Sequence, residues 1–196
     1  MDFDFLELAQ NSCALNMETY QQFHQLMEQR TIIVNGEINE AVVENVILPL
    51  RDFEKDNSNE PVILILNTPG GSVADGLVLC NIIDSYTKPL HIYVLGYSCS
   101  MGTLILCSGN NNPNVTKFCY PFSFALLHLG HTTVSGETGS VDDVIDFNRA
   151  VEQKIRQYIT SNTKISEEEY DKHNRKQWYL TSEEMLEKGL INVIIK

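Results

Sequence analysis

The sequence contains few basic residues and no long hydrophobic segment. Its 196 residues include 14 lysines and arginines against 26 aspartates and glutamates, which gives a formal net charge of −12. Nucleic acids and anionic membrane surfaces need a basic footprint on the protein, so this balance argues against both as partners. No apolar run approaches the roughly 20 residues that a transmembrane helix needs, and we therefore expect no membrane partner.

The N-terminus also lacks the features of a secretion signal. The stretch MDFDFLELAQ is acidic, whereas a signal peptide begins with basic residues followed by an apolar segment. We therefore expect a cytoplasmic location. Residues 1–19 show no clear periodicity and are expected to form an N-terminal arm or loop. Residues 20–196 are expected to form a single domain, because the chain is short for two domains with separate cores.

Sequence patterns for metal and nucleotide sites are missing. The five histidines show neither HExxH nor Cys/His ligand spacing, and no nucleotide-binding motif occurs. We therefore expect no metal and no cofactor, and any dependence on ATP would belong to a separate protein. The cysteines have no CxxC spacing and are expected to be reduced and buried as small apolar residues. They are Cys13, Cys80, Cys99, Cys107 and Cys119.

Short aliphatic runs alternate with helical patterns along most of the chain. Runs of strand length occupy residues 30–36, 61–67 and 89–96, and residues 39–56, 72–86 and 100–109 between and after them have helical spacing. Strands with almost no polar alternation, separated by helices, are typical of a parallel sheet covered by helices. The fold class predicted here is therefore α/β.

The C-terminal half continues this pattern with a long helix. Residues 115–120 and 123–129 are predicted strands, and residues 141–162 form a predicted helix with an apolar stripe. A further helix is expected at residues 182–189, with Ser182 as its N-cap and Gly189 as its stop, followed by a strand at 190–196. The apolar stripe of the long helix consists of Val144, Phe147, Val151, Ile155 and Ile159.

Two strand-to-helix turns carry the residues with chemical potential. NTPGGS, residues 67–72, contains a glycine pair, and GYSCSMG, residues 96–102, places two serines and a cysteine together. Each turn alone is explained as well by tight packing as by function. Together, however, a serine at a helix N-terminus and backbone N–H groups from both turns are the parts of an acyl-transfer site. His128, at the end of a predicted strand, is a candidate general base.

In this order, the motifs resemble the proteolytic subunit of the ATP-dependent Clp protease, the ClpP family, over about residues 20–196. The resemblance is carried by RTIIVNGEI, LILNTPGGSVADGL, GYSCSMGTLILCSG, SFALLH and LTSEEMLEKGLINVII. It implies a crotonase-like spiral of βαβ units with a protruding handle helix, and two stacked heptameric rings that enclose a chamber. It also implies unfolded protein or peptide substrates, a ring formed with itself or with a paralogue, and a separate AAA+ unfoldase.

Site residues follow from the resemblance by position. Ser100 corresponds to the nucleophile and His128 to the general base, while the N–H groups of Gly71 and Met101 correspond to the oxyanion hole. Ser98 and Cys99 stand where the family has small residues and are expected to pack against the turn. Cys99 is kept as an alternative nucleophile, because side-chain geometry decides which group faces the histidine.

The sequence departs from the family at the third member of the triad. An ungapped alignment places Gln177 where the family has an aspartate. An amide oxygen can accept the histidine Nδ1–H and orient the ring, but it carries no charge to stabilise the imidazolium. Asp171 and Asn174 are alternatives that lie off register.

Other departures concern the partners. Residues 1–19 do not match the family's axial loops, and Ile63 and Ile65 replace aromatics that shape its pocket for the ATPase. The segment 131–140 stands where the family's handle begins, and the helix from Val141 resembles the handle itself.

Three functions remain open from the sequence. The first is a Clp-type serine endopeptidase, with either full or reduced activity. The second is an inactive or impaired ring subunit whose triad has decayed at Gln177 and which supports an active paralogue. The third is a crotonase-fold enzyme acting on an acyl-CoA thioester, which would leave the Ser-Met-Gly turn and His128 without a role.

Overall fold

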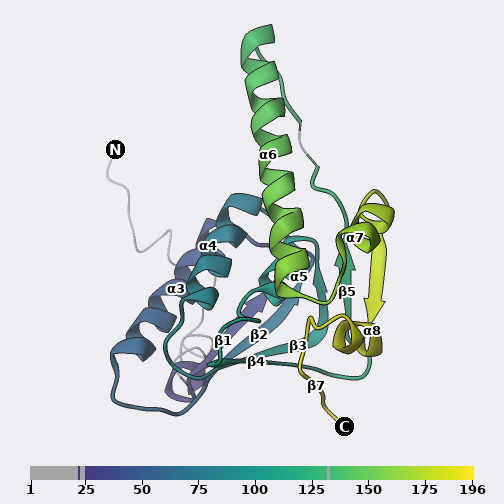
Figure 1. Cartoon of the computed structure of the whole chain (residues 1–196). Coiled ribbons are helices and arrows are strands. Elements are labelled where there is room, and N and C mark those ends of the chain that lie inside the picture. Colours follow the sequence, from purple (N-terminus) through teal and green to yellow (C-terminus); the bar gives the residue numbers. More distant parts are fainter. Residues whose placement is uncertain (1–21, 23–24, 132) are drawn as a thin grey trace, which may run out of the picture.

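A computed structural model describes residues 22, 25–131 and 133–196 (Figure 1). The expected arm at residues 1–19 lies outside these residues, and the domain boundary at residue 20 stays a prediction. The elements in chain order are β1 (Thr31–Asn35), α3 (Glu40–Lys55), β2 (Val62–Thr68), α4 (Val73–Asp84), β3 (Leu90–Cys99), α5 (Met101–Cys107), β4 (Val115–Cys119), β5 (Phe124–Leu127), α6 (Thr138–Asn162), α7 (Glu167–His173), β6 (Trp178–Thr181), α8 (Ser182–Glu187) and β7 (Val193–Ile194).

The predicted α/β class is confirmed, and the sheet is mostly parallel. Its strand order is β1-β2-β3-β4-β7, and every neighbouring pair in this path is parallel. The strand β5 pairs in parallel with the end of β3, and β6 adds to β5 in antiparallel orientation. Because β3 carries both β4 and β5, the sheet branches at the C-terminal end of β3, where the Ser-Met-Gly turn begins.

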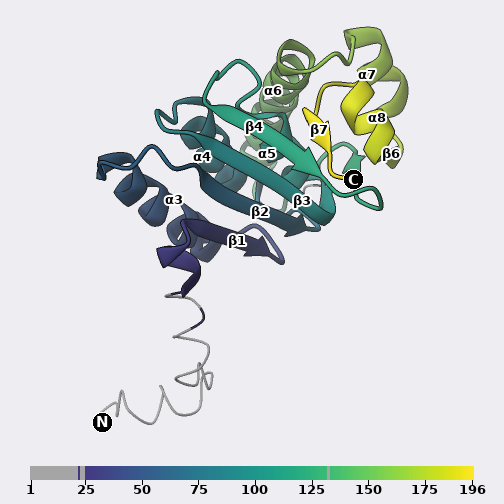
Figure 2. The same ribbon diagram turned by 90° about the horizontal axis from the view of Figure 1, so that it is seen from below.

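Helices α3, α4 and α5 lie on one side of the sheet (Figure 2). Along β2 the burial alternates strictly between fully and partly buried residues, although its first five residues are all aliphatic. The fully buried side chains face the helices, while the opposite face carries apolar side chains that are only partly buried. On that open face the rings of Tyr93 and Phe118 stack at 4.7 Å, and Ile63 and Ile65 belong to the same partly buried set.

Side-chain caps fix where the helices begin. The predicted cap Asn39 accepts a hydrogen bond from the Val42 N–H at 3.2 Å. The predicted cap Ser182 is wrong, because Thr181 is the N-cap of α8. The Thr181 hydroxyl accepts from the Glu184 N–H, and the Glu184 carboxylate accepts from the Thr181 N–H at 2.8 Å. This reciprocal capping box satisfies two backbone donors, which a cap one residue later would leave unpaired.

Helix α6 projects from the body of the molecule (Figure 1). It begins at Thr138, three residues before the predicted start. Its apolar stripe divides into two parts, because Ile159 is 2% exposed whereas Phe147 is 68% exposed. Only the C-terminal part of the helix therefore packs on the core.

The described cysteines behave as predicted. Cys80, Cys99, Cys107 and Cys119 are free and buried, while Cys13 lies outside the described residues. Within the described part of the chain, none of the helices is long and apolar enough to cross a membrane.

Candidate active site

Ser100 lies at the sharp turn between β3 and α5. Its φ of 54° and ψ of −118° fall outside the conformations that non-glycine residues usually adopt. It occupies the N-cap position, yet its side chain makes no capping hydrogen bond. The strained turn therefore leaves the Ser100 hydroxyl half-buried and free of the helix that follows.

The glycine turn packs directly against this serine. Gly70 and Gly71 have φ values of 99° and 150°, which favour glycine. A Cβ added to Gly70 would lie 2.7 Å from the Ser100 Cβ and 3.0 Å from the Met101 nitrogen, and real side chains do not approach so closely. Gly70 is thus required for the two turns to meet, whereas a Cβ on Gly71 would lie too close to the backbone of Ile38.

The other side of the glycine turn is held by Ile38. The Ile38 N–H donates to the Gly70 carbonyl at 2.8 Å, and the Ser72 N–H donates to the Ile38 carbonyl at 2.9 Å. Neither the Gly71 N–H nor the Met101 N–H donates a hydrogen bond to another described residue. Two unused donors therefore remain on the two turns that meet at Ser100.

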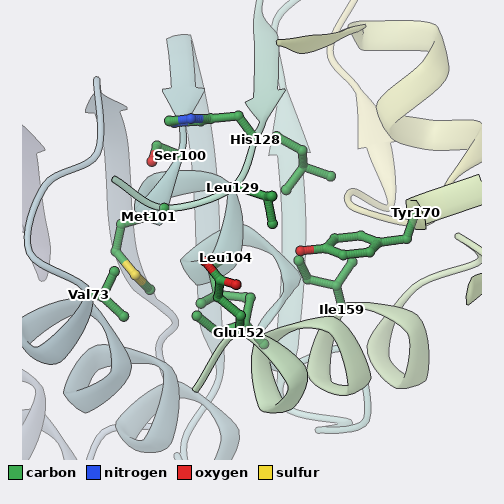
Figure 3. Close-up of a pocket in the computed structure, with 12 residues that line it drawn as sticks. Val73, Ser100, Met101, Leu104, His128, Leu129, Glu152, Ile159 and Tyr170 are labelled. Atoms are coloured by element: carbon green, nitrogen blue, oxygen red, sulfur yellow. The ribbon is translucent and has the colours of Figure 1, made fainter. Parts of the chain in front are cut away.

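His128 follows β5, which pairs with the end of β3 in the register Cys99↔Leu126. The Ser100 N–H continues this pairing by donating to the Leu126 carbonyl at 2.7 Å. His128 is then two residues further along, and its imidazole extends toward Ser100 (Figure 3). No hydrogen bond joins the two side chains, although both line one cavity.

The cavity at Ser100 and His128 is mostly apolar. Its lining residues are Val73, Ser100, Met101, Leu104, Leu127, His128, Leu129, Gly130, Glu152, Ile155, Ile159 and Tyr170. They come from α4, from the turn at Ser100 and α5, from the end of β5 and the segment after it, and from α6 and α7. Ser100 therefore borders an apolar cavity that extends to α6 and α7.

The other two nucleophile candidates do not line this cavity. Ser98 is fully buried. Cys99 is 8% exposed, and burial raises the pKa of its thiol, which disfavours the reactive thiolate. Both residues therefore fit the packing role expected from the sequence.

Gln177 lies where the alignment predicts a partner for His128, but its side chain is engaged elsewhere. The pairing Leu127↔Trp178 between β5 and β6 would place His128 opposite Gln177 if it continued by one step. Gln177 is exposed, however, and its Oε1 accepts a hydrogen bond from the Tyr179 hydroxyl at 2.8 Å. No hydrogen bond joins Gln177 to His128 in this arrangement.

The two off-register alternatives differ from each other. Both carboxylate oxygens of Asp171 accept hydrogen bonds from Arg156, each at 2.7 Å, so Asp171 is already paired. Asn174 lies beside the histidine segment, because its backbone carbonyl accepts from the Leu129 N–H at 2.9 Å. Its side-chain oxygen Oδ1 is buried without a hydrogen-bond partner among the described residues. Asn174 therefore offers a free acceptor next to His128.

Sequence reasoning missed two polar residues of the cavity, Glu152 and Tyr170. Glu152 lies three and seven residues before Ile155 and Ile159, so it belongs to the side of α6 that lines the cavity, where its side chain is still exposed. A charged residue that interrupts an apolar stripe was the available signal. Tyr170 comes from α7, an element that the sequence pattern did not reveal.

Clusters of potential metal ligands are not seen in the described part of the chain, where no three His, Cys, Asp or Glu side chains converge. The groups that meet at this site are a hydroxyl, an imidazole and backbone N–H groups.

Comparison with known proteins gives one family. Residues 15–196 match the model of the family described as Clp protease. A curated relative is the ATP-dependent Clp protease proteolytic subunit 1 of Rhodopirellula baltica, which is 24% identical over 188 residues. The matched region covers 93% of this chain and 82% of the relative.

Proposed function

The chain belongs to the Clp protease family, and from this we propose that it is a serine endopeptidase subunit that hydrolyses peptide bonds through Ser100. Family membership supports a ClpP-like peptidase subunit. The catalytic type, the residues and the level of activity are the proposed part. The observation that carries it is the meeting of two turns at Ser100, where Gly70 packs against the serine and its helix.

In the proposed reaction, the Ser100 Oγ attacks the carbonyl carbon of the substrate while His128 takes the hydroxyl proton. The N–H groups of Gly71 and Met101 donate to the oxyanion of the tetrahedral intermediate. His128 then gives the proton to the leaving amine, which leaves an acyl-enzyme on Ser100. A water molecule, deprotonated by His128, releases the acyl group and restores the serine.

The proposed reaction also requires a group that orients His128. We propose that either Gln177, after releasing Tyr179, or Asn174 accepts the Nδ1–H. The unpaired Oδ1 atom of Asn174 beside the histidine segment supports the second arrangement. Both acceptors are uncharged amides, so the imidazolium gains less stabilisation than an aspartate provides.

The proposed assembly is a double ring that encloses a chamber, in which α6 acts as the handle between rings. The subunits of the ring come from this chain or from a paralogue. Unfolded chains would be delivered by a separate AAA+ unfoldase, and the open face of the sheet at Ile63, Ile65, Tyr93 and Phe118 is the proposed place for it to bind. Stacked aromatics on a partly exposed apolar face support this assignment.

An impaired subunit with a structural role is the second candidate. The hydrogen bond from Tyr179 to Gln177 favours it, because it occupies the amide oxygen that would otherwise orient His128. In that case the chain would contribute to a mixed ring whose activity comes from a paralogue.

A fluorophosphonate probe separates these candidates, because it reacts only with an activated serine. We expect labelling of wild type at Ser100, identified by peptide mass spectrometry, and none in Ser100→Ala. Ser98→Ala is the matched control and should still be labelled. Equal labelling of wild type and Ser100→Ala would exclude Ser100 as the nucleophile, and absence of labelling in both would favour the impaired subunit.

A further inference from the structure

The cavity beside Ser100 has a carboxylate in its wall. Glu152 from α6 and Tyr170 from α7 project into the cavity on the side away from Ser100 and His128 (Figure 3). The remaining wall between these two ends is built largely from aliphatic side chains, among them Leu104, Ile155 and Ile159. The cavity thus joins an apolar passage to a negative charge.

No cation among the described residues neutralises Glu152. The nearest arginines along α6 are committed to other acids: Arg149 pairs with Asp146 at 3.0 Å, and Arg156 pairs with Glu167 at 3.0 Å and with Asp171 at 2.7 Å. The Glu152 carboxylate forms no ion pair or side-chain hydrogen bond with a described residue. Its charge is therefore available to a ligand.

Tyr170 adds a second polar group at the same end. Its side chain is buried, and both this burial and the charge of Glu152 raise the pKa of its hydroxyl. The phenol and the carboxylate are hence close enough to influence each other. A hydrogen-bond donor entering the cavity would meet an anionic oxygen and a neutral hydroxyl together.

We propose that Glu152 determines the specificity of this cavity for a long cationic side chain, lysine or arginine, on the residue whose carbonyl Ser100 attacks. The proposal rests on the proposed function, because it assumes that Ser100 is the nucleophile. The aliphatic stem of such a side chain packs against the apolar wall, and its charged end reaches Glu152. An aliphatic side chain fills the same wall but leaves the carboxylate without a partner.

The test compares two peptides that are identical except for the residue before the scissile bond, which is lysine in one and norleucine in the other. Norleucine keeps the aliphatic stem and lacks the ammonium group. We expect wild type to cleave the lysine peptide with about fivefold higher kcat/KM, the effect of one partly solvated ion pair. Glu152→Gln, which removes only the charge, should bring the ratio of the two kcat/KM values close to one.

Asp143→Asn is the matched control. It removes the same charge from the same helix at a position that is exposed, as Glu152 is, but Asp143 does not line the cavity. It should leave the ratio at the wild-type value. A wild-type ratio of kcat/KM for the lysine peptide to that for the norleucine peptide at or below one would overturn the proposal. An equal fall of this ratio in Asp143→Asn and Glu152→Gln would also overturn it, because it would indicate a general effect of charge.

A binding measurement keeps this test independent of the catalytic rate. Product peptides that end in lysine or norleucine are titrated into Ser100→Ala by isothermal calorimetry, so no turnover is needed. Tighter binding of the lysine peptide, lost in Ser100→Ala/Glu152→Gln, supports the cavity assignment even if wild type is not labelled by the fluorophosphonate. Equal binding of both peptides overturns it even if Ser100 is labelled.

Discussion

Gln177 is the residue at which the proposed catalytic site differs most from that of a serine protease with an aspartate. Its Oε1 accepts a hydrogen bond from Tyr179, while Asn174 has an unpaired Oδ1 beside the histidine segment. Whichever amide orients His128, the charge that stabilises the imidazolium is missing.

Restoring this charge should raise the rate. We expect Gln177→Asp to increase kcat for a short peptide, with an upper bound of about 10⁴-fold taken from the loss seen when the aspartate of a serine protease becomes an asparagine. The measurement is the initial rate of hydrolysis of a fluorogenic peptide. Asp171→Asn serves as a control, because Asp171 is paired with Arg156 and should not supply the missing charge. A rate in Gln177→Asp equal to that of wild type would mean that an amide already suffices.

At the scale of single residues, the resemblance names Gly71, Ser100, Met101 and His128 as site residues, and their catalytic roles stay a prediction. The structure places Ser100, Met101 and His128 around one cavity and packs the glycine turn against Ser100. The partner of Gln177 could not be predicted, since Tyr179 reaches it through the conformation of an exposed segment. Glu152 was missed because a single charge in a helical stripe usually marks the solvent-facing side.

Helix α5 depends on a buried lysine from β4. Lys117 is fully buried, and its Nζ donates to the carbonyls of Leu106 and Ser108 at 2.7 and 2.8 Å. These carbonyls lie at the C-terminal end of α5, where the helix has no N–H donors of its own for them. Burial lowers the pKa of Lys117 to about 8. The C-terminal end of α5, the helix that follows Ser100, is thus capped by an ammonium group inside the core.

This arrangement predicts a dependence of stability on pH. Below pH 8 the lysine is protonated in both states and the full cost of burying its charge is present. Between pH 8 and about 10.4, the unfolded chain binds more protons than the folded one, so the free energy of unfolding should rise with pH through this group. Urea unfolding is measured for wild type and for Lys117→Met at the same protein concentration. The comparison separates the contribution of Lys117 to the pH dependence from that of the cysteine thiols.

We expect the difference in free energy of unfolding, wild type minus Lys117→Met, to increase between pH 7.5 and pH 10 by a large part of about 3 kcal/mol. A difference that does not change with pH would mean that burial does not lower the pKa of Lys117. The subtraction is needed because burial also raises the pKa of Cys107 to about 12 and that of Cys119 to about 11, which lowers stability above pH 9.

Most elements could be predicted from the sequence, with two exceptions. The strands β1 to β5 and helices α3 to α6 have apolar patterns of the right period, so the structure differs from their predicted ranges only at the ends. Helix α7 buries one tyrosine, Tyr170, among exposed acidic and basic residues, which is too little for a periodic signal. The strand β6 has four residues and exists because it pairs with β5 more than fifty positions earlier. Both missed elements depend on contacts far away in the sequence.

The exposed apolar residues on the projecting part of α6 should determine whether two rings of subunits join. Phe147 is 68% exposed and Val144 is 41% exposed. In the proposed double ring these side chains would be covered by the facing ring. We expect Phe147→Asp to halve the particle mass, because a carboxylate buried between rings has no partner.

Mass photometry or light scattering measures this change. Gln153→Asp places the same charge on an exposed position of the same helix and should keep the wild-type mass. If the mass of Phe147→Asp also stays that of wild type, the helix does not join two rings.

The projecting part of α6 also couples two equilibria that are usually separate. Between Thr138 and Ala150 no residue is fully buried, so a lone subunit gives this segment almost no tertiary support. Isolated helical segments of this length are marginally stable in water. Folding of the segment and pairing of the rings would then be a single concentration-dependent event, and circular dichroism would lose helical signal on dilution alone. The helix content of this protein would in effect report its state of association.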